Sequence, residues 1–105
     1  MLYSDVCFVL ATGGTKGQAL QIVKSQGAYT FTFQDFRFAP GPTTGRIDGD
    51  KLTFESSILG LTVRFAGTIT PQEIRGRISN SENDSRFTMD VRLPLKPLST
   101  PMPNC

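Results

Sequence analysis

The chain has 105 residues, of which 38% are hydrophobic, and its formal net charge is +2. This length predicts one domain around a single core. So small a positive charge does not by itself argue for nucleic acid, which we do not expect as a partner. Histidine is absent, which removes the commonest general base and the commonest metal ligand. We therefore expect neither a metal site nor a resident cofactor, and the sequence favours a binding protein over an enzyme.

Short, evenly spaced segments with the alternation of β-strands run through the chain. Turns rich in glycine, proline, asparagine and serine separate them, as is typical of an antiparallel meander, sandwich or barrel. We predict an all-β fold: a single antiparallel up-and-down β-barrel of about eight strands over residues 1–93, followed by an extended, proline-rich tail over residues 94–105. The predicted strands are residues 5–11, 18–25, 28–38, 43–48, 51–57, 60–70, 73–79 and 86–93.

The first segment contains Cys7, and Cys105 ends the proline-rich tail. Two cysteines are too few for a disulfide framework, and a mobile tail is a poor partner for a stable bridge. We therefore expect two free thiols and a reducing compartment, the cytoplasm. Residues 1–11 lack the basic start of a signal peptide, and no apolar run reaches the length of a membrane span, so we expect no membrane partner.

A glycine-rich stretch, residues 9–17 with the sequence VLATGGTKG, overlaps the end of the first segment and continues beyond it. They resemble the cofactor-binding turn of short-chain dehydrogenases, in which glycines let a dinucleotide pyrophosphate approach the N-terminus of a helix. The last glycine of that turn is missing here, because the chain continues with Gln18. The Tyr-x-x-x-Lys pair of that family is missing too, since Phe33 stands at this spacing from Tyr29. We interpret the stretch as the glycine-rich loop of a β-hairpin.

The third segment, residues 28–38, carries aromatic rings in two phases. A β-bulge near Gln34 and Asp35 would bring all of the rings to one face and bend the strand, as closure of a barrel requires. The alternative is that the strand ends near Gln34 and a loop begins. The rings concerned are Tyr29, Phe31, Phe33, Phe36 and Phe38.

Two later stretches, residues 45–53 and 67–75, repeat the pattern of a β-hairpin. Each has alternating apolar residues on both sides of a short reversal. In the first, Gly49-Asp50 is the predicted tip, and glycine at the first position favours a type I′ or II′ turn. In the second, the fixed negative φ of Pro71 excludes those turns and predicts type I. The carboxylates at the first tip are too few for a calcium loop.

From residue 51 onward, apolar and polar side chains alternate, which predicts one face toward the core and one toward water. The apolar face carries Leu52, Phe54, Leu61, Val63, Phe65, Ile74, Ile78, Phe87, Met89, Val91 and Leu93. The opposite face carries the late arginines, Arg64, Arg75, Arg77, Arg86 and Arg92. We interpret it as an ordinary solvated face; the alternative is a phosphate- or RNA-binding face, with residues 29–33 as a base-stacking strand.

The whole layout resembles calycin-like barrels, the group that includes lipocalins and avidins, and small bacterial barrel proteins. Residues 45–54 carry the resemblance, because they match the Gly-x-Ile-x-Gly-Asp-x-Leu-x-Phe rhythm of late hairpins in such bacterial proteins. The Gly-x-Trp entry of lipocalins is absent, since the chain has no tryptophan. The resemblance implies a barrel interior that is either filled by side chains or holds one small ligand.

We expect a small apolar or aromatic molecule as the ligand, bound in the barrel interior or mouth. Such sites are concave and lined by aromatic rings with a few polar groups. Gln34 and Asp35, beside the expected bulge, are the candidate polar groups, and no catalytic residue is assigned. The candidate ligand-binding rings are Phe8, Tyr29, Phe31, Phe33, Phe54, Phe65 and Phe87.

Two other functions stay open. One is a cyclase- or isomerase-type enzyme in a similar barrel, in which Asp35 or Tyr29 would act after burial has shifted its pKa. The other is a structural module with a solid core, which would form homo-oligomers through an exposed sheet face or edge.

Overall fold

A computed structural model describes residues 1–35, 42–58, 61–80, 88–97 and 102–105. The described residues form ten β-strands, and this part of the chain offers no helix long and apolar enough to cross a membrane. Eight strands build one antiparallel sheet in the order β5-β4-β1-β10-β9-β8-β7-β6, and the other two form a separate ribbon. The strands are β1 (Leu2–Ser4), β2 (Cys7–Val9), β3 (Gly14–Lys16), β4 (Gln18–Ser25), β5 (Ala28–Asp35), β6 (Thr43–Asp48), β7 (Lys51–Ile58), β8 (Leu61–Ile69), β9 (Glu73–Asn80) and β10 (Thr88–Lys96).

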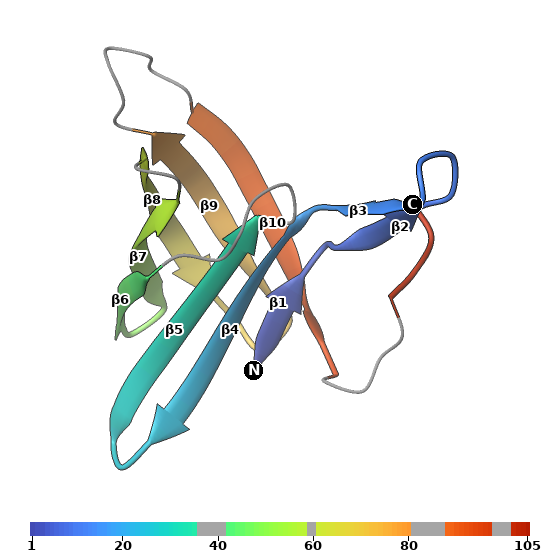
Figure 1. The fold of residues 1–105 in the computed structure, drawn as a ribbon. Coiled ribbons are helices and arrows are strands. Elements are labelled where there is room, and N and C mark those ends of the chain that lie inside the picture. Colours follow the sequence, from blue (N-terminus) through green and yellow to red (C-terminus); the bar gives the residue numbers. More distant parts are fainter. Residues whose placement is uncertain (36–41, 59–60, 81–87, 98–101) are drawn as a thin grey trace.

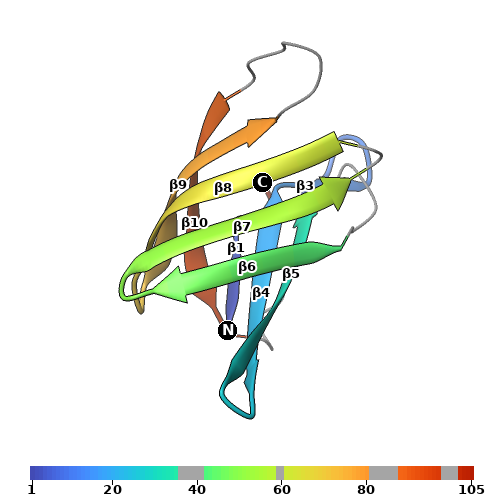
Figure 2. The same cartoon turned by 90° about the vertical axis from the view of Figure 1, so that its left-hand side faces the viewer.

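The large sheet curls until its two edge strands, β5 and β6, approach each other (Figure 1, Figure 2). The backbone N–H of Phe33 donates a hydrogen bond across this seam to Thr43 Oγ1 at 3.3 Å. The ring of Phe31 lies directly against Gly45, where a Cβ atom would come within 2.9 Å of it. The all-β fold is confirmed, and the sheet is nearly closed into a barrel.

The meander from β6 to β10 follows the predicted alternation. Gly49-Asp50 forms the first tip, and the φ of Gly49 is 64° while that of Asp50 is not positive, as in a type II′ turn. At the second tip, Pro71 and its successor have no positive φ, as predicted. Thr70 Oγ1 accepts hydrogen bonds from the N–H groups of the two residues after the proline, at 3.2 and 3.1 Å.

β5 keeps one phase over its whole described length. Its pairing with β4 is continuous as far as Asp35, so the bulge predicted near Gln34 is wrong for these residues. Asp35 simply continues the inward phase of Phe33, and both side chains are buried. Phe36 and Phe38, whose parity suggested the bulge, lie outside the described residues.

Side chains from both halves of the sheet fill the barrel at its middle. The rings of Phe33, Phe54 and Phe65 follow one another with centroids 4.9 and 5.0 Å apart. Gly67 faces Gly76 on the neighbouring strand, and a Cβ atom at either would lie 2.8 Å from Phe65 Cζ. The ring therefore occupies the space that these glycines leave. The buried core consists of Tyr3, Leu20, Ile22, Phe31, Phe33, Leu52, Phe54, Phe65, Ile74, Ile78, Val91 and Leu93.

The strand predicted over residues 5–11 is wrong in its bounds. Two shorter strands, β1 and β2, lie on either side of Asp5, where the backbone changes direction. β1 lies in the barrel between β4 and β10, whereas β2 leaves it and pairs with β3 in the ribbon. The carboxylate of Asp5 accepts a hydrogen bond from the backbone N–H of Gln18 at 2.7 Å. Gly17, with a φ of 110°, approaches so closely that a Cβ atom would lie 2.7 Å from Asp5 Oδ1. This polar corner divides an otherwise apolar run into two strands.

The glycine-rich stretch is the loop of the β2–β3 hairpin, as we interpreted it. The N–H of Gly13 donates to the carbonyl of Val9 at 2.9 Å, and the φ of Gly13 is 71°. β3 and β4 follow the loop, at the place where a dinucleotide-binding turn would lead into a helix.

The C-terminal residues return to the ribbon (Figure 1). The backbone of Phe8 donates to the carbonyl of Pro103 at 2.8 Å and accepts from the N–H of Cys105 at 3.0 Å. Cys7 and Cys105 form a disulfide, so the prediction of free thiols is wrong, and the inference of a reducing compartment loses its basis. A cysteine count cannot reveal that the two ends of a chain meet. β10 also continues to Lys96, past the predicted end of the last strand.

Candidate functional site

The rings predicted to bind a ligand do not gather at one place. Phe8 is half-buried on β2, in the ribbon beside the barrel. Tyr29 is 41% exposed near the tip of the β4–β5 hairpin, with the ammonium of Lys24 5.6 Å from its ring centroid. Phe87 lies outside the described residues. The other four, Phe31, Phe33, Phe54 and Phe65, are brought together in the buried core.

A hollow of about 290 Å³ opens at the end of the barrel where β4 begins and β5 ends. We call it the mouth hollow. It combines two carboxylates, one amide, one ammonium group and one thioether at the level where the apolar core stops. Its lining residues are Asp5, Lys16, Gly17, Gln18, Asp35 and Met89.

The inward-facing side chains of β4 and β5 change from apolar to polar at this hollow. Leu20 pairs with Phe33 in the core, and the next inward pair along the same two strands is Gln18 with Asp35. These polar side chains are only 8% and 7% exposed, and Gln18 Nε2 donates a hydrogen bond to Asp35 Oδ2 at 3.4 Å. Burial of a carboxylate is costly unless it is hydrogen-bonded, so a buried carboxylate at a hollow is a candidate for function.

The remaining walls of the mouth hollow come from the corner at Asp5 and from β10. Asp5 holds the start of β4 through its hydrogen bond to the Gln18 backbone, which fixes where the amide side chain projects. Met89, half-buried near the start of β10, supplies an apolar wall, and Lys16 lies exposed at the rim. The hollow can therefore accept hydrogen bonds on one side and contact an apolar group on the other.

Of the two polar residues named from the sequence, Asp35 lines the mouth hollow, whereas Gln34 lies on the opposite face of β5 and is not among the lining residues. Sequence analysis missed Gln18. The signal was available: Leu20 and Ile22 set an inward parity on β4, and Gln18 is the polar residue that continues it.

The enzyme hypothesis placed Asp35 and Tyr29 together, and the geometry separates them. They stand six residues apart on one strand, which corresponds to roughly 20 Å at the usual rise of a β-strand. Burial raises the pKa of a different tyrosine, Tyr3, whose hydroxyl donates to the carbonyl of Thr70 at 3.1 Å. Within the described ranges, no three acidic or cysteine side chains lie together as a metal site would require.

Comparison with known proteins adds no constraint. No protein family, curated protein or solved structure matches this chain. What the site can do must therefore be argued from its own residues.

Proposed function

We propose that this protein binds a small apolar or aromatic molecule at the barrel mouth, with a polar group of that ligand held by Asp35 and Gln18. The observation that supports this most is the buried polar pair in an inward-facing row whose other buried members are apolar. A row of this kind needs only aliphatic or aromatic residues to stabilise a core. A carboxylate and an amide at its last position have a direct use if they contact a ligand.

The chemistry of the pair selects the ligand's polar group. An ionised carboxylate only accepts hydrogen bonds, so the ligand should present an amine, an amide N–H or a hydroxyl to Asp35. Its apolar part would contact Met89 and the upper edge of the core. A hollow of about 290 Å³ is at the lower end of ligand-site volumes, which favours a molecule of one ring.

The mouth is a better location than the deep interior because of the packing below it. Phe33, Phe54 and Phe65 contact one another, and Phe65 fills the space above Gly67 and Gly76. A ligand placed at that level would have to displace these rings, which together stabilise the core by several kcal/mol.

The test is a titration of ¹⁵N-labelled protein with benzylamine, followed by NMR, with benzyl alcohol as an uncharged probe. We expect saturable shifts at the amides of residues 17–19, Asp35 and Met89. Asp35→Asn should weaken benzylamine binding by roughly tenfold, because a charge-assisted hydrogen bond is lost. Gln34→Ala, on the opposite face of the same strand, is the matched control and should bind as the wild type does.

Equal affinity in Asp35→Asn and wild type would contradict the proposal. So would the absence of saturable shifts with both probes, combined with native mass spectrometry that detects no carried compound. That second result would favour the structural module with a solid core.

A further inference from the structure

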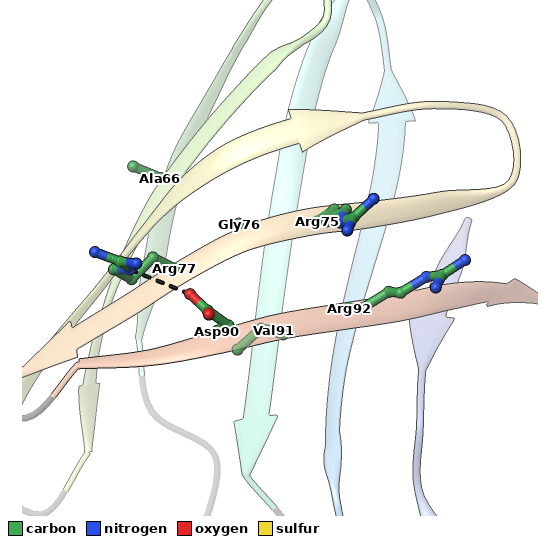
Figure 3. Close-up of a pocket in the computed structure, with 7 residues that line it drawn as sticks. All are labelled: Ala66, Arg75, Gly76, Arg77, Asp90, Val91 and Arg92. Carbon is green, nitrogen blue, oxygen red and sulfur yellow. Dashed lines mark hydrogen bonds and ion pairs between the residues drawn. The ribbon is translucent and has the colours of Figure 1, made fainter.

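A second hollow lies on the outer face of the barrel, away from the mouth. It measures about 520 Å³ and lies over β8, β9 and β10. We call it the arginine hollow, because three arginines surround a floor of small or backbone groups (Figure 3). Its lining residues are Ala66, Arg75, Gly76, Arg77, Asp90, Val91 and Arg92.

Arg75 and Arg92 are direct cross-strand neighbours. Like charges placed opposite each other destabilise a sheet, so this pair needs an explanation. On the same outer face, the cross-strand pairs Asp48–Lys51, Glu55–Arg64 and Arg77–Asp90 all join opposite charges. The Arg75–Arg92 pair departs from that pattern.

The acidic residues nearby do not neutralise both arginines. Arg92 forms an ion pair with Glu73, and Arg77 forms one with Asp90 at 3.2 Å. The Arg75 guanidinium makes no ion pair with the part of the chain that the structure describes. Figure 3 shows the Arg75 and Arg92 side chains extending toward the β8–β9 turn, whereas Arg77 extends the other way toward Asp90. The positive charge of Arg75 is therefore the one in this hollow that no carboxylate of the described residues pairs with.

We propose that the arginine hollow binds the phosphate group of a small phosphate monoester, held between Arg75 and Arg92. Cross-strand neighbours lie about 5 Å apart at Cα, so two guanidinium forks can reach oxygens of one phosphate. Arginine binds phosphate through two parallel N–H donors, which a point charge cannot do. Ala66 on β8 is small and exposed and is the cross-strand neighbour of Arg77, which leaves room on that side of the hollow for the rest of the ligand.

A nucleic-acid strand fits this surface less well. The described residues that line the hollow include no aromatic ring, whereas single-stranded nucleic acid is usually held by stacking of its bases on such rings. The small net charge of +2 also gives little long-range attraction for a polyanion. The observations therefore favour a single phosphate group.

The experiment is an NMR titration with glycerol 3-phosphate and with inorganic phosphate, against sodium chloride at matched ionic strength. We expect saturable shifts confined to amides of residues 75–77 and 90–93, with both phosphates and not with chloride. Arg75→Gln should weaken binding at least fivefold. Arg46→Gln, an exposed arginine on β6 of the same outer face, is the control and should change it by less than twofold.

Three results would overturn the proposal. The first is no saturable shift up to about 10 mM phosphate, where even a weak site would begin to fill. The second is an equal loss in Arg75→Gln and Arg46→Gln, which would mean general attraction to a positive surface. The third is saturable binding of an oligonucleotide without binding of either phosphate. None of these outcomes bears on the mouth hollow, because the two sites share no residue.

Discussion

The meander β6–β10 and the ribbon β2–β3 are held together in different ways. In the meander, each strand from β7 to β10 pairs with the strand that precedes it in the chain, and short reversals at Gly49-Asp50 and Pro71-Gln72 set the register of two of these pairs. The ribbon is fixed by residues at the other end of the chain, through the bond between Cys7 and Cys105 at a separation of 98 residues. The alternation of apolar and polar residues in a sequence predicts pairing between neighbouring strands. It gives no information about contacts between residues that are far apart in the chain, such as Cys7 and Cys105.

β1 is a second contact between distant parts of the chain. It lies between β4 and β10, so the first strand of the chain joins the last strand of the meander to the β4–β5 hairpin. Only three residues, Leu2–Ser4, make this connection, and Tyr3 is their buried anchor at 1% exposure. The sheet is thus made continuous by pairing between an N-terminal strand and the last strand of the meander, whereas the seam of the barrel lies between β5 and β6.

The largest expected effect comes from breaking the meander at its glycine pair. A Cβ atom at Gly76 would lie 2.3 Å from the Ala66 carbonyl oxygen and 2.6 Å from Gly67 Cα. These are backbone atoms that cannot move aside, so Gly76→Val should cost on the order of 4 kcal/mol of unfolding free energy or prevent folding. Urea unfolding followed by circular dichroism measures the change.

The matched control is Gly14→Val in the ribbon. There the nearest atom to an added Cβ is Thr12 Oγ1 at 3.6 Å, an ordinary contact, and the change should stay within about 0.5 kcal/mol. Similar losses in both variants would mean that the close approach of β8 and β9 is not what makes Gly76 necessary.

Removing the disulfide should have the next largest effect. A disulfide stabilises a protein mainly by restricting the unfolded chain, and its typical contribution is about 3 kcal/mol. The double variant Cys7→Ser/Cys105→Ser should lose about this much stability in urea, and dithiothreitol should lower the wild type to the same value. Hydrogen exchange under native conditions should quicken more at Phe8 and Cys105 than in the meander, whose amides lose only the protection that follows the global unfolding free energy. Equal loss of protection at Phe54 or Phe65 would show that ribbon and meander unfold as one unit.

A smaller loss is expected at the corner that joins the ribbon to the barrel. Gly17→Ala combines a φ of 110° with a contact of 2.7 Å to Asp5 Oδ1, and should cost about 2 kcal/mol. Gly27→Ala has a φ of 80° with no atom near its Cβ, and should cost about 1 kcal/mol. The difference between the two reports chiefly the close contacts of residue 17 with Asp5 and Val6. If the two costs are equal, the corner adjusts freely, and the mouth hollow has no fixed wall on that side.

Sequence analysis correctly predicted those parts of the structure in which strand alternation or turn chemistry alone decides the conformation. Parity placed Phe54, Phe65 and Ile78 in the core, and turn chemistry located the tips at Gly49 and Pro71. Alternation failed at Asp5, where a single carboxylate that binds the β4 backbone redirects an apolar run. It also suggested a bulge near Gln34, which does not occur as far as Asp35; Phe36 and Phe38, whose phase suggested the bulge, lie outside the described residues.

Of the two buried polar residues in the mouth hollow, sequence analysis named Asp35 and missed Gln18, and its reason for naming Asp35 was wrong. Asp35 was named because of the expected bulge, yet it faces inward by unbroken alternation. Gln18 begins a predicted strand, and its parity with Leu20 and Ile22 indicates an inward side chain, but parity does not say which residue lies opposite it. Only its pairing with Asp35, which is a tertiary contact, shows that the two polar groups share one site.

The smallest expected effect is an increase in stability. It compares the like-charge pair Arg75–Arg92 on the outer face with the opposite-charge pair Arg77–Asp90. Arg75→Gln removes one of two like charges that face each other, so it should raise the unfolding free energy by a few tenths of a kcal/mol. Salt screens exposed charges over about 10 Å at 0.1 M, so the gain should disappear near 1 M sodium chloride. Asp90→Asn, which leaves Arg77 without its exposed partner, should instead lower stability by a similar amount. If Arg75→Gln also lowers stability at low salt, Arg75 is a structural residue, and its cost cannot be attributed to a binding role.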